Sequence, residues 1–515
     1  MIFKLLISLY QTYSQNEKLI MKINMNKNIY ILLALLIIQP TLAADSNNLS
    51  DLLIKKGIIT QEDLDNLDKG VSIEQLLFNK GVINQVELTS LLNKKIEQEP
   101  VSLVSSTERQ EVKSNVLNKS TKKPKNDNPV SVGFTKKGLT VKSDDGNWST
   151  NLQWRAQMRL TDPYRSDPRQ ISHFNNDDET SFELRRARMK IGGHGYKPWL
   201  KYYFEVDLQP TRSTSDSSTA ASSRLIDWRI TLDKYEALSF RAGQWKINYN
   251  RERVDSSGRQ TFVERSIANR VFTTDRQVGV MAFGRLFNGS PADLNYYLGI
   301  FNGEGRGVKN DDSDMLHMAR LQWNFLGREL KWRQSDTGFS EDPAGTLAFA
   351  TSSTQGKCTR WSSSGCGNLD GFEAVSNAAK GQFEIDQIVQ ETAFKWRGFA
   401  WQQEYHKKKV NDVVNNTRSE LTGGYAQAGY FFNQIFPTIP KKVEFALRYA
   451  FVDEPNKTDI SNTNTRKEYT GAINYFISDH NNKLTLDYSH LTLDDGFLDR
   501  QVSDNRLRFQ WDISF

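Results

Sequence analysis

The sequence predicts an all-β protein: a transmembrane antiparallel β-barrel of about 16 strands, preceded by a small α-helical periplasmic repeat segment and a disordered linker. Three observations lead to this fold class. The N-terminus carries an export signal, hydropathy alternates with a period of two from about residue 131 onward, and all but five of the aromatic residues lie in that same part of the chain. Alternation of this kind, in segments of about ten residues, is typical of strands that cross an outer membrane.

Composition excludes some broad classes. The chain has 515 residues, of which 38% are hydrophobic, and its mean hydropathy is −0.60. A helical membrane protein with several spans needs repeated apolar runs of about 20 residues, so this class is excluded. The net charge is only +6, from 67 basic and 61 acidic residues, and such a balance does not indicate a nucleic-acid partner.

Residues 1–43 are predicted to be a signal peptide. Lys22 and Lys27 precede an apolar run of about ten residues, and small residues follow it, so cleavage is expected after Ala43 or Ala44. The alternative is an N-terminal membrane anchor, for which the run is short. Export of the mature chain follows from the signal peptide.

The first 20 residues are expected to be an untranslated upstream extension. Met21 and Met25 stand closer to the basic and apolar parts of the signal peptide than Met1 does, and offer better starts.

Residues 44–96 contain an internal repeat. The motif LLIKKGII at 52–59 recurs 24 residues later as LLFNKGVI at 76–83. Each copy is typical of a helix that ends at glycine and is followed by a second helix. We interpret this segment as a periplasmic tether or oligomerisation element; the alternative is a solvated stalk. Residues 97–130, rich in Ser, Lys, Asn, Glu and Pro, are predicted to be a flexible linker.

The barrel is expected over residues 131–515, and its last ten residues show the alternation best. Polar residues at 506, 508, 510, 512 and 514 alternate with apolar ones at 507, 509, 511, 513 and 515. A soluble sandwich also alternates, but export, strand length and aromatic residues near strand ends favour the membrane barrel. Seven short turns and eight long loops separate the segments, which gives about 16 strands and room for an aqueous channel. The terminal Phe515 is expected to act as an assembly signal for the barrel assembly machinery.

Basic residues on one face of the segment FELRRARMKIGG are predicted to line the lumen. Arg186, Arg188 and Lys190 share one parity, so three cations point the same way. Arg185 breaks the alternation, and it must therefore lie at a rim, at a bulge, or facing a neighbouring subunit.

The longest basic loop, Lys246 to Arg276, is predicted to fold inward and narrow the pore. Its cations are Lys246, Arg251, Arg253, Arg259, Arg265, Arg270 and Arg276, against four acids. Arginine stays charged and offers a planar fork to oxyanions, so these residues, with those of the preceding segment, form the predicted anion path. The alternative is that the arginines pair with neighbouring carboxylates and pin the loop to the wall, above all Arg265 beside Glu264.

Two further features complete the expectations. Cys358 and Cys366 lie eight positions apart in a Gly/Ser-rich loop of an exported chain, which predicts a disulfide that stiffens the loop. None of the six histidines stands in a nucleophile motif, and no phosphate-binding or dinucleotide fingerprint is present. We therefore expect no catalytic residues, cofactor or metal, and no enzyme.

The order of motifs resembles that of the phosphate-selective porin O and P family. FELRRARMKIGG followed by KPWLKYYFEVDL resembles its early strand pair, and RAGQWKINYNRERVDSSGRQTFVERSIANRVF followed by DRQVGV resembles its constriction loop and the next strand. GYAQAGYFF, VEFALRYAFVD, GAINYFISDHNNKLTLDYS and RLRFQWDISF resemble its closing strands, so the resemblance covers about 131–515.

This resemblance implies a sixteen-stranded homotrimeric porin of the bacterial outer membrane, with an inward-folded third loop. It also implies an Arg/Lys-lined path for phosphate or polyphosphate, with Arg185 and Arg186 at or near the central anion site. The chain departs from the pattern of the phosphate-selective members, which rely on clustered lysines, because its loop has a single lysine, Lys246, and four acids. A general porin of low selectivity, or a structural or adhesive outer-membrane protein linked to the periplasm by its repeats, is the alternative function.

Overall fold

The computed structural model of the chain describes residues 130–163, 168–174, 180–208, 224–310, 312–363 and 365–515. The predictions for the signal peptide, the helical repeats and nearly all of the linker fall on residues 1–129, outside the described part. Within the described ranges, every helix is too short or too polar to cross a bilayer.

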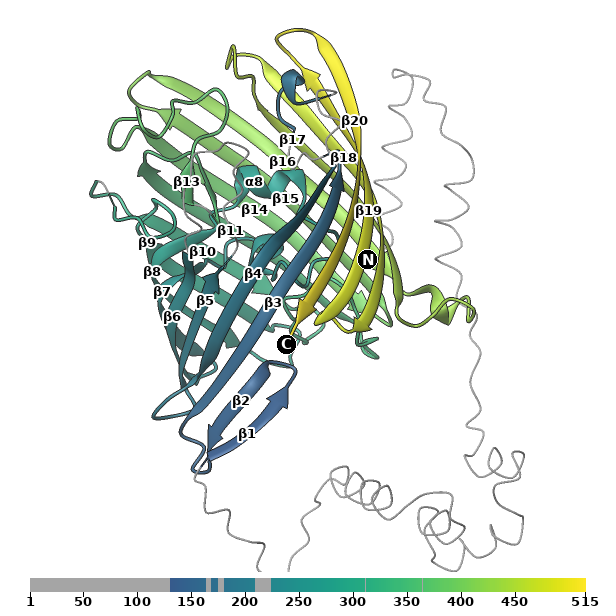
Figure 1. The fold of residues 1–515 in the computed structure, drawn as a ribbon. Coiled ribbons are helices and arrows are strands. Elements are labelled where there is room, and N and C mark those ends of the chain that lie inside the picture. Colours follow the sequence, from purple (N-terminus) through teal and green to yellow (C-terminus); the bar gives the residue numbers. More distant parts are fainter. Residues whose placement is uncertain (1–129, 164–167, 175–179, 209–223, 311, 364) are drawn as a thin grey trace, which may run out of the picture. The chain divides into compact units, whose positions relative to one another are not determined.

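Sixteen antiparallel strands form a closed barrel, because the last strand pairs with the first one (Figure 1). This confirms the predicted antiparallel β-barrel of about 16 strands. The barrel strands are β3 (Ser149–Asp162), β4 (Ser181–His194), β5 (Leu200–Asp207), β6 (Arg224–Tyr235), β7 (Leu238–Lys246), β8 (Arg276–Leu286), β9 (Leu294–Phe301), β10 (Leu316–Trp323), β11 (Ala344–Gly356), β14 (Phe383–Trp396), β15 (Phe399–Asp412), β16 (Thr417–Tyr430), β17 (Val443–Pro455), β18 (Thr463–Ser478), β19 (Asn482–Asp495) and β20 (Arg500–Ser514).

A β-hairpin precedes the barrel and lengthens its wall at the end where the short turns lie. β1 (Val130–Thr135) pairs with β2 (Gly138–Ser143). Residues 139–142 of β2 in turn pair with residues 149–152 of β3. β20 pairs with the following part of β3, residues 155–162, so β2 continues the line of β20 beyond the chain's end. Figure 1 shows the hairpin projecting from the barrel close to the C-terminus.

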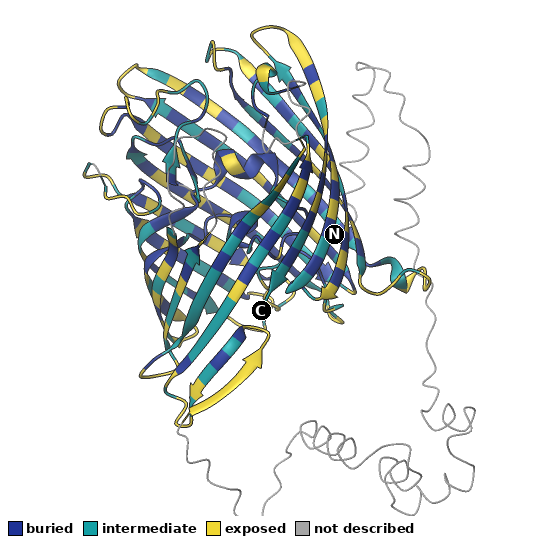
Figure 2. Ribbon diagram, in the orientation of Figure 1, coloured by how far each residue is buried: buried dark blue, intermediate teal, exposed yellow. Residues whose placement is uncertain are grey.

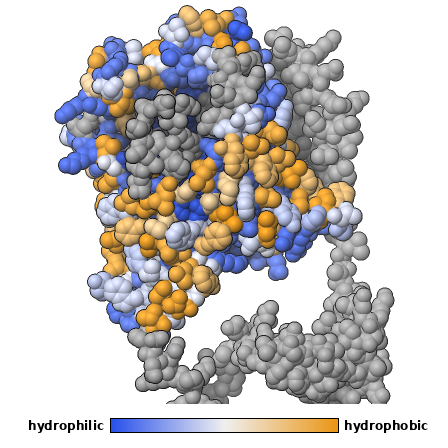
Figure 3. Space-filling model, viewed as in Figure 1, coloured by the Kyte–Doolittle hydropathy of each residue, from blue (hydrophilic) through white to orange (hydrophobic). Residues whose placement is uncertain are grey.

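The alternation seen in the sequence corresponds to the two faces of the barrel wall. Buried and exposed residues follow each other along nearly every strand (Figure 2). In β17, for example, Phe445, Leu447 and Tyr449 face outward and are exposed, whereas Glu444 and Arg448 face inward and are buried. Apolar side chains accordingly gather on the outer surface (Figure 3), as expected where strands face lipid.

The remaining elements lie in the connections. They are η1 (Ile171–His173), α7 (Arg251–Val254), α8 (Ile267–Phe272), the two-stranded sheet of β12 (Arg360–Ser362) and β13 (Gly365–Gly367), and η2 (Phe432–Gln434). The third long connection, residues 247–275, contains α7 and α8 and is almost wholly buried. Its α8 packs against β15, β16 and β17, and Figure 1 shows it within the ring of strands.

Two connections differ from the sequence-based expectation. The expected loop at 407–419 shrinks to residues 413–416, because β15 and β16 continue with polar side chains on both faces. The expected short turn at 326–329 is instead part of a connection over residues 324–343 between β10 and β11. There the chain turns inward: Gln334 and Ser335 are buried and meet the third loop.

Candidate functional site

A β-bulge in β4 places two consecutive arginines on the inner side of the wall. Gln157 of β3 pairs with Arg186, but the next residue, Met158, pairs with Leu184, so Arg185 is the extra residue of the bulge. Of the three placements open to Arg185 from sequence alone, the structure shows the bulge. A bulge re-aims a side chain in this way at functional sites of other sheets.

Both arginines bind one carboxylate of the third loop. Glu264 Oε1 lies 3.0 Å from Nε of Arg185, 3.2 Å from Nη2 of Arg186 and 2.8 Å from Nη2 of Arg159 on β3. Burial alone raises the pKa of Glu264, but the charges of Arg186, Arg159 and Arg185 outweigh it and hold the pKa well below its usual range. Glu183 of β4 joins the group, with Oε1 3.9 Å from Nη1 of Arg159 and 3.7 Å from Nε of Arg185. The three guanidinium groups and two carboxylates together carry a net charge of about +1.

Carboxylates of β14, β15, β18 and β19 accept hydrogen bonds from backbone N–H groups of the third loop. The N–H of Glu252 donates to Glu404 at 2.6 Å, and the N–H of Arg251 donates to Glu391 at 3.0 Å. The acceptors of the Val263 and Ile267 N–H groups are Asp487 and Glu468, at 3.0 Å each. Charge-assisted hydrogen bonds of this kind are the strong ones. Three of these carboxylates also bind an arginine of the wall: Glu391 binds Arg320, Glu468 binds Arg448 and Asp487 binds Arg508.

Four further cations of the predicted path are also paired with carboxylates. Arg251 is fully buried and lies 3.4 Å from Glu391, and Arg253 binds Asp275. Arg188 binds Glu205 and Asp207 at 2.9 and 3.3 Å, and Arg276 binds Asp227 at 2.5 Å. For these residues the structure fits the alternative in which arginines pin the loop and the wall, because their charges are compensated.

Lys246 and Arg265 are held by backbone carbonyl groups instead. Nζ of Lys246 donates to the carbonyls of residues 253, 254 and 255, at 2.9, 3.2 and 3.2 Å. The guanidinium of Arg265 donates to the carbonyls of Glu252 and Asp255, at 2.7 and 2.6 Å. Arg265 therefore does not use the carboxylate of Glu264, and neither cation forms an ion pair with a carboxylate of the described residues.

A cavity of about 1060 Å³ lies between the third loop and the basic part of the wall. Ten Lys and Arg residues line it against three acids, so its lining is strongly positive. Among the residues that the structure describes, Lys190 and Arg259 line it without a hydrogen-bond or ion-pair partner for their charged groups. Burial lowers the pKa of Arg259, as does the nearby charge of Arg333. The cavity reaches the short-turn end of the barrel at Asn481 and Ser514.

Sequence reasoning missed several lumen cations, among them Arg155, Arg159 and Arg241. Arg155 binds Asp512 and Ser257, and Arg159 binds Glu264, so β3 contributes to the site as much as β4 does. A signal for them exists in the sequence. Arg155, Gln157 and Arg159 share one parity within a 14-residue strand, which places all three on the inner face.

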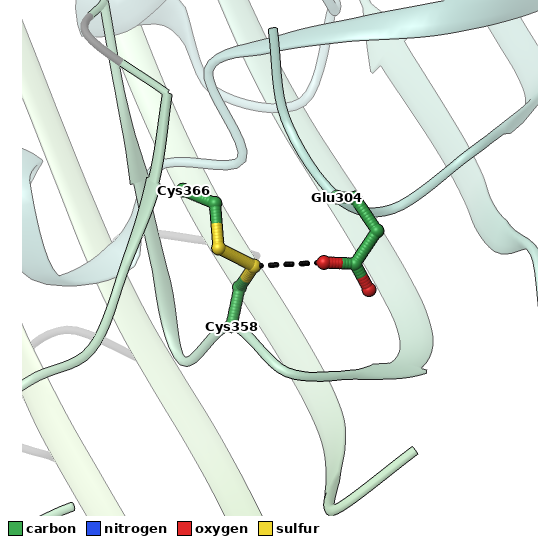
Figure 4. Close-up of side chains that lie close together, drawn as sticks. All are labelled: Glu304, Cys358 and Cys366. Carbon is green, nitrogen blue, oxygen red and sulfur yellow. Dashed lines mark hydrogen bonds between the residues drawn. A yellow bond between two sulfur atoms is a disulfide. The ribbon is translucent and has the colours of Figure 1, made fainter. Parts of the chain in front are cut away.

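The two cysteines form a disulfide in the fifth long connection, with their Cα atoms 5.7 Å apart. Figure 4 shows the carboxylate of Glu304 facing this disulfide, with Oε2 3.0 Å from Sγ of Cys358. These three residues are close enough to suggest a metal site. Metal binding needs thiolates, however, and the two sulfur atoms are bonded to each other, so the group holds the loop together and offers no such ligands.

The chain's last residue is tied to the first barrel strand. The N–H of Phe515 donates to the carbonyl of Trp154 at 2.9 Å, and the N–H of Trp154 donates to the carbonyl of Phe515 at 3.2 Å. The side chain of Phe515 points outward and is 68% exposed.

Comparison with known proteins gives one family match. The model of the family described as phosphate-selective porin O and P matches residues 159–342 and 369–513. No curated protein sequence matches the chain significantly.

Several solved structures of outer-membrane proteins are similar to the chain at low sequence identity. The outer membrane channel DcaP of Acinetobacter baumannii is 12% identical, with a TM-score of 0.46 over 73% of this chain and 99% of that one. An anion-selective porin from Comamonas acidovorans is 11% identical, with a TM-score of 0.45 over 72% and 100%. OmpT, an outer membrane protein of Vibrio cholerae, is 10% identical, with a TM-score of 0.45 over 73% and 99%.

Proposed function

This chain belongs to the phosphate-selective porin O and P family, and from that premise we propose that it lets small anions diffuse passively across the outer membrane. Family and fold make it a porin of the bacterial outer membrane, a channel rather than an enzyme. The proposal concerns the finer properties: anion preference, with phosphate or polyphosphate as the solutes to test first, a third loop that narrows the pore, and assembly as a homotrimer by the barrel assembly machinery.

The positive cavity is the observation that carries the proposal. A narrow lumen with uncompensated Lys and Arg side chains raises the local concentration of anions and replaces part of their hydration. Lys190, Arg259 and Lys246 fit this task best, because they have no carboxylate partner among the described residues. The three arginines around Glu264 add a net positive charge next to the loop.

The third loop explains how a lumen with many acids can still favour anions. Its backbone N–H groups donate hydrogen bonds to the carboxylates of Glu391, Glu404, Glu468 and Asp487. Three of these acids are also paired with an arginine of the wall. Acids that are occupied in this way leave the positive cavity as the path for solutes.

The parts of the chain outside the barrel receive roles from the sequence alone. We infer that residues 1–43 direct export and that the repeats at 44–96 remain in the periplasm. The linker before β1 would join them to the short-turn end of the barrel.

The test is a reversal potential measured across a KCl gradient with purified protein in a planar bilayer, repeated with added phosphate. Anion selectivity with a phosphate block supports the proposal in full. Anion selectivity without a block identifies a general anion porin, and cation selectivity contradicts the anion path. Absence of stepwise conductance favours the structural or adhesive alternative.

A further inference from the structure

Aromatic rings line the same cavity as the cations. Tyr203 on β5, Trp245 on β7 and Phe283 on β8 belong to its lining, together with Trp332 from the connection over residues 324–343. Tyr203, Phe283 and Trp332 are partly exposed, whereas Trp245 is buried against Phe301. Lumen faces of outer-membrane barrels are polar as a rule, so this cluster of rings is unusual for its position.

Two guanidinium groups lie over these rings. Cζ of Arg229 lies 4.3 Å from the ring centre of Tyr203, and Cζ of Arg241 lies 4.8 Å from that of Phe283 and 5.7 Å from that of Trp245. A guanidinium that stacks on a ring with one face can accept a second planar group on its other face.

Arg241 is the more informative of the two arginines. It donates to Oγ1 of Thr231 at 3.2 Å and to Oδ1 of Asn248 at 3.4 Å, and neither acceptor is charged. Its positive charge is therefore not compensated by a carboxylate within the described residues. A solute that reaches Arg241 meets a charge and a flat apolar surface at one place.

Inorganic anions cannot use this surface. Phosphate and chloride carry no apolar area that a ring would remove from water, and their binding needs converging N–H donors. A planar organic anion uses both parts, because its ring stacks on a guanidinium or an aromatic face while its anionic group meets Lys190 or Arg259. A cavity of about 1060 Å³ is large enough for a solute of that size.

We propose that this cavity binds organic anions that carry a planar ring, such as aromatic carboxylates, and that these are among the solutes of the channel. The inference rests on the proposed anion path and adds the class of solute to it. The alternative, in which the rings serve only to pack Arg229 and Arg241, predicts no difference between planar and non-planar anions.

The experiment compares two blockers of the chloride current through wild-type channels. Benzoate and cyclohexanecarboxylate have similar size and equal charge, and only benzoate is planar and aromatic. We expect benzoate to block at a concentration roughly five- to tenfold lower, as stacking on a cation or ring suggests. Equal block by the two anions, in channels that remain anion-selective, overturns the inference and leaves the proposed function intact. Cation-selective channels overturn both.

Substitutions of two aromatic residues of the cavity test whether the preference for benzoate arises there. In Phe283→Leu and Tyr203→Leu the preference for benzoate over cyclohexanecarboxylate should fall severalfold. Phe240→Leu is the matched control, because Phe240 lies on β7 but faces outward and is 50% exposed. A preference that survives both lumen substitutions, or one that Phe240→Leu also removes, contradicts the assignment to this cavity.

Discussion

Nη2 of Arg186 lies 3.2 Å from the carboxylate of Glu264, and this contact joins the basic wall of the barrel to the loop that crosses its lumen. The bulge at Arg185 adds a second guanidinium to this contact, since it turns the side chain of Arg185 toward the same carboxylate. On the other side, the loop is attached through backbone N–H groups that donate to acids of the wall. Cations of the wall hold the loop as well, since Nζ of Lys408 and Nζ of Lys483 donate to the carbonyls of Val271 and Gln260.

Glu264→Gln should increase the preference for anions. The change removes one negative charge from the group formed with Arg159, Arg185 and Arg186 and keeps the size of the side chain. A unit charge several ångströms from a passing ion changes its free energy by about 0.6 kcal/mol in water, so the permeability ratio should rise roughly threefold. Reversal potentials measure it.

The control for this change is Glu420→Gln, which removes an exposed acid that pairs with Lys407 on the outer face. The ratio should not change in that variant. An unchanged ratio in Glu264→Gln would show that ions do not pass near this group.

Lys190→Gln combined with Arg259→Gln should lower the preference for anions. Both side chains line the positive cavity and form no ion pair within the described residues. We expect a fall of severalfold in the ratio of anion to cation permeability. Lys467→Gln alters a partly exposed outward residue paired with Asp494; it is the control and should behave like the wild type. Equal selectivity in all three proteins would contradict the proposed path.

Glu391→Ala should loosen the third loop. Glu391 is fully buried, binds both Arg251 and Arg320, and accepts the N–H of Arg251. Removal of one partner of a buried ion pair typically costs about 3–5 kcal/mol, because the remaining charges are left uncompensated. The expected result is larger and noisier single-channel current, as the loop moves away from the wall.

Glu384→Ala is the matched control on the same strand. Glu384 faces outward and is exposed, where it accepts a hydrogen bond from Asn411. Its substitution should leave the current steady. If the two variants behaved alike, the loop would not depend on the buried pair.

Sequence alone predicted the barrel well, because strand parity depends only on neighbouring residues. The alternation at 506–515 appears unchanged in β20, and the inward direction of Arg186, Arg188 and Lys190 follows from the same rule. Even the irregularity at Arg185 was visible as a break in parity. Its form was not, because a bulge is defined by the register with β3.

The sequence could not predict which carboxylate pairs with each cation, since the two partners lie far apart in the chain. Arg276 binds Asp227 of another strand, and Arg251 binds Glu391, 140 positions away. Parity places such residues on the inner face but does not say which of them meet. The inward fold of residues 324–343 escaped prediction for a similar reason: Gln334 is polar and turn-like locally, and only its contact with the third loop explains its burial.

The third loop should be held more firmly at mildly acidic pH than at alkaline pH. Burial and the adjacent carboxylate of Glu404 raise the pKa of Glu252 from 4.5 to about 7. The charge of Arg448 and the hydrogen bonds from Ser266 lower this pKa, but by less. Because the pKa of Glu252 is higher in the folded loop than in the unfolded chain, protonation of Glu252 stabilises the folded loop. This stabilisation is complete below the unfolded pKa of 4.5, and it is lost as the pH rises through about 7.

Current recordings at about pH 5 and about pH 8 test this sign. The wild type should show more loop fluctuations at the higher pH, and Glu252→Gln should show the same low level at both. Glu236→Gln, which alters an exposed acid at a short turn, should retain the wild-type dependence. More fluctuation at the lower pH would contradict the argument.

Phe515→Ala should lower the amount of assembled barrel in cells, severalfold, while leaving the assembled barrel almost as stable as before. The backbone of Phe515 already makes both hydrogen bonds to Trp154 that fix the end of β20, and alanine keeps them. Its side chain is 68% exposed, so substitution costs the finished barrel little, within about 0.5 kcal/mol if it behaves as a surface site. A strong effect on assembly would then reflect recognition of the side chain before the barrel closes.

Phe509→Ala is the control for Phe515→Ala, because Phe509 faces outward on the same strand and is 42% exposed. Barrel levels in outer-membrane fractions and the temperature of unfolding in detergent separate the two effects. Equal levels of both variants would show that the terminal position has no special role.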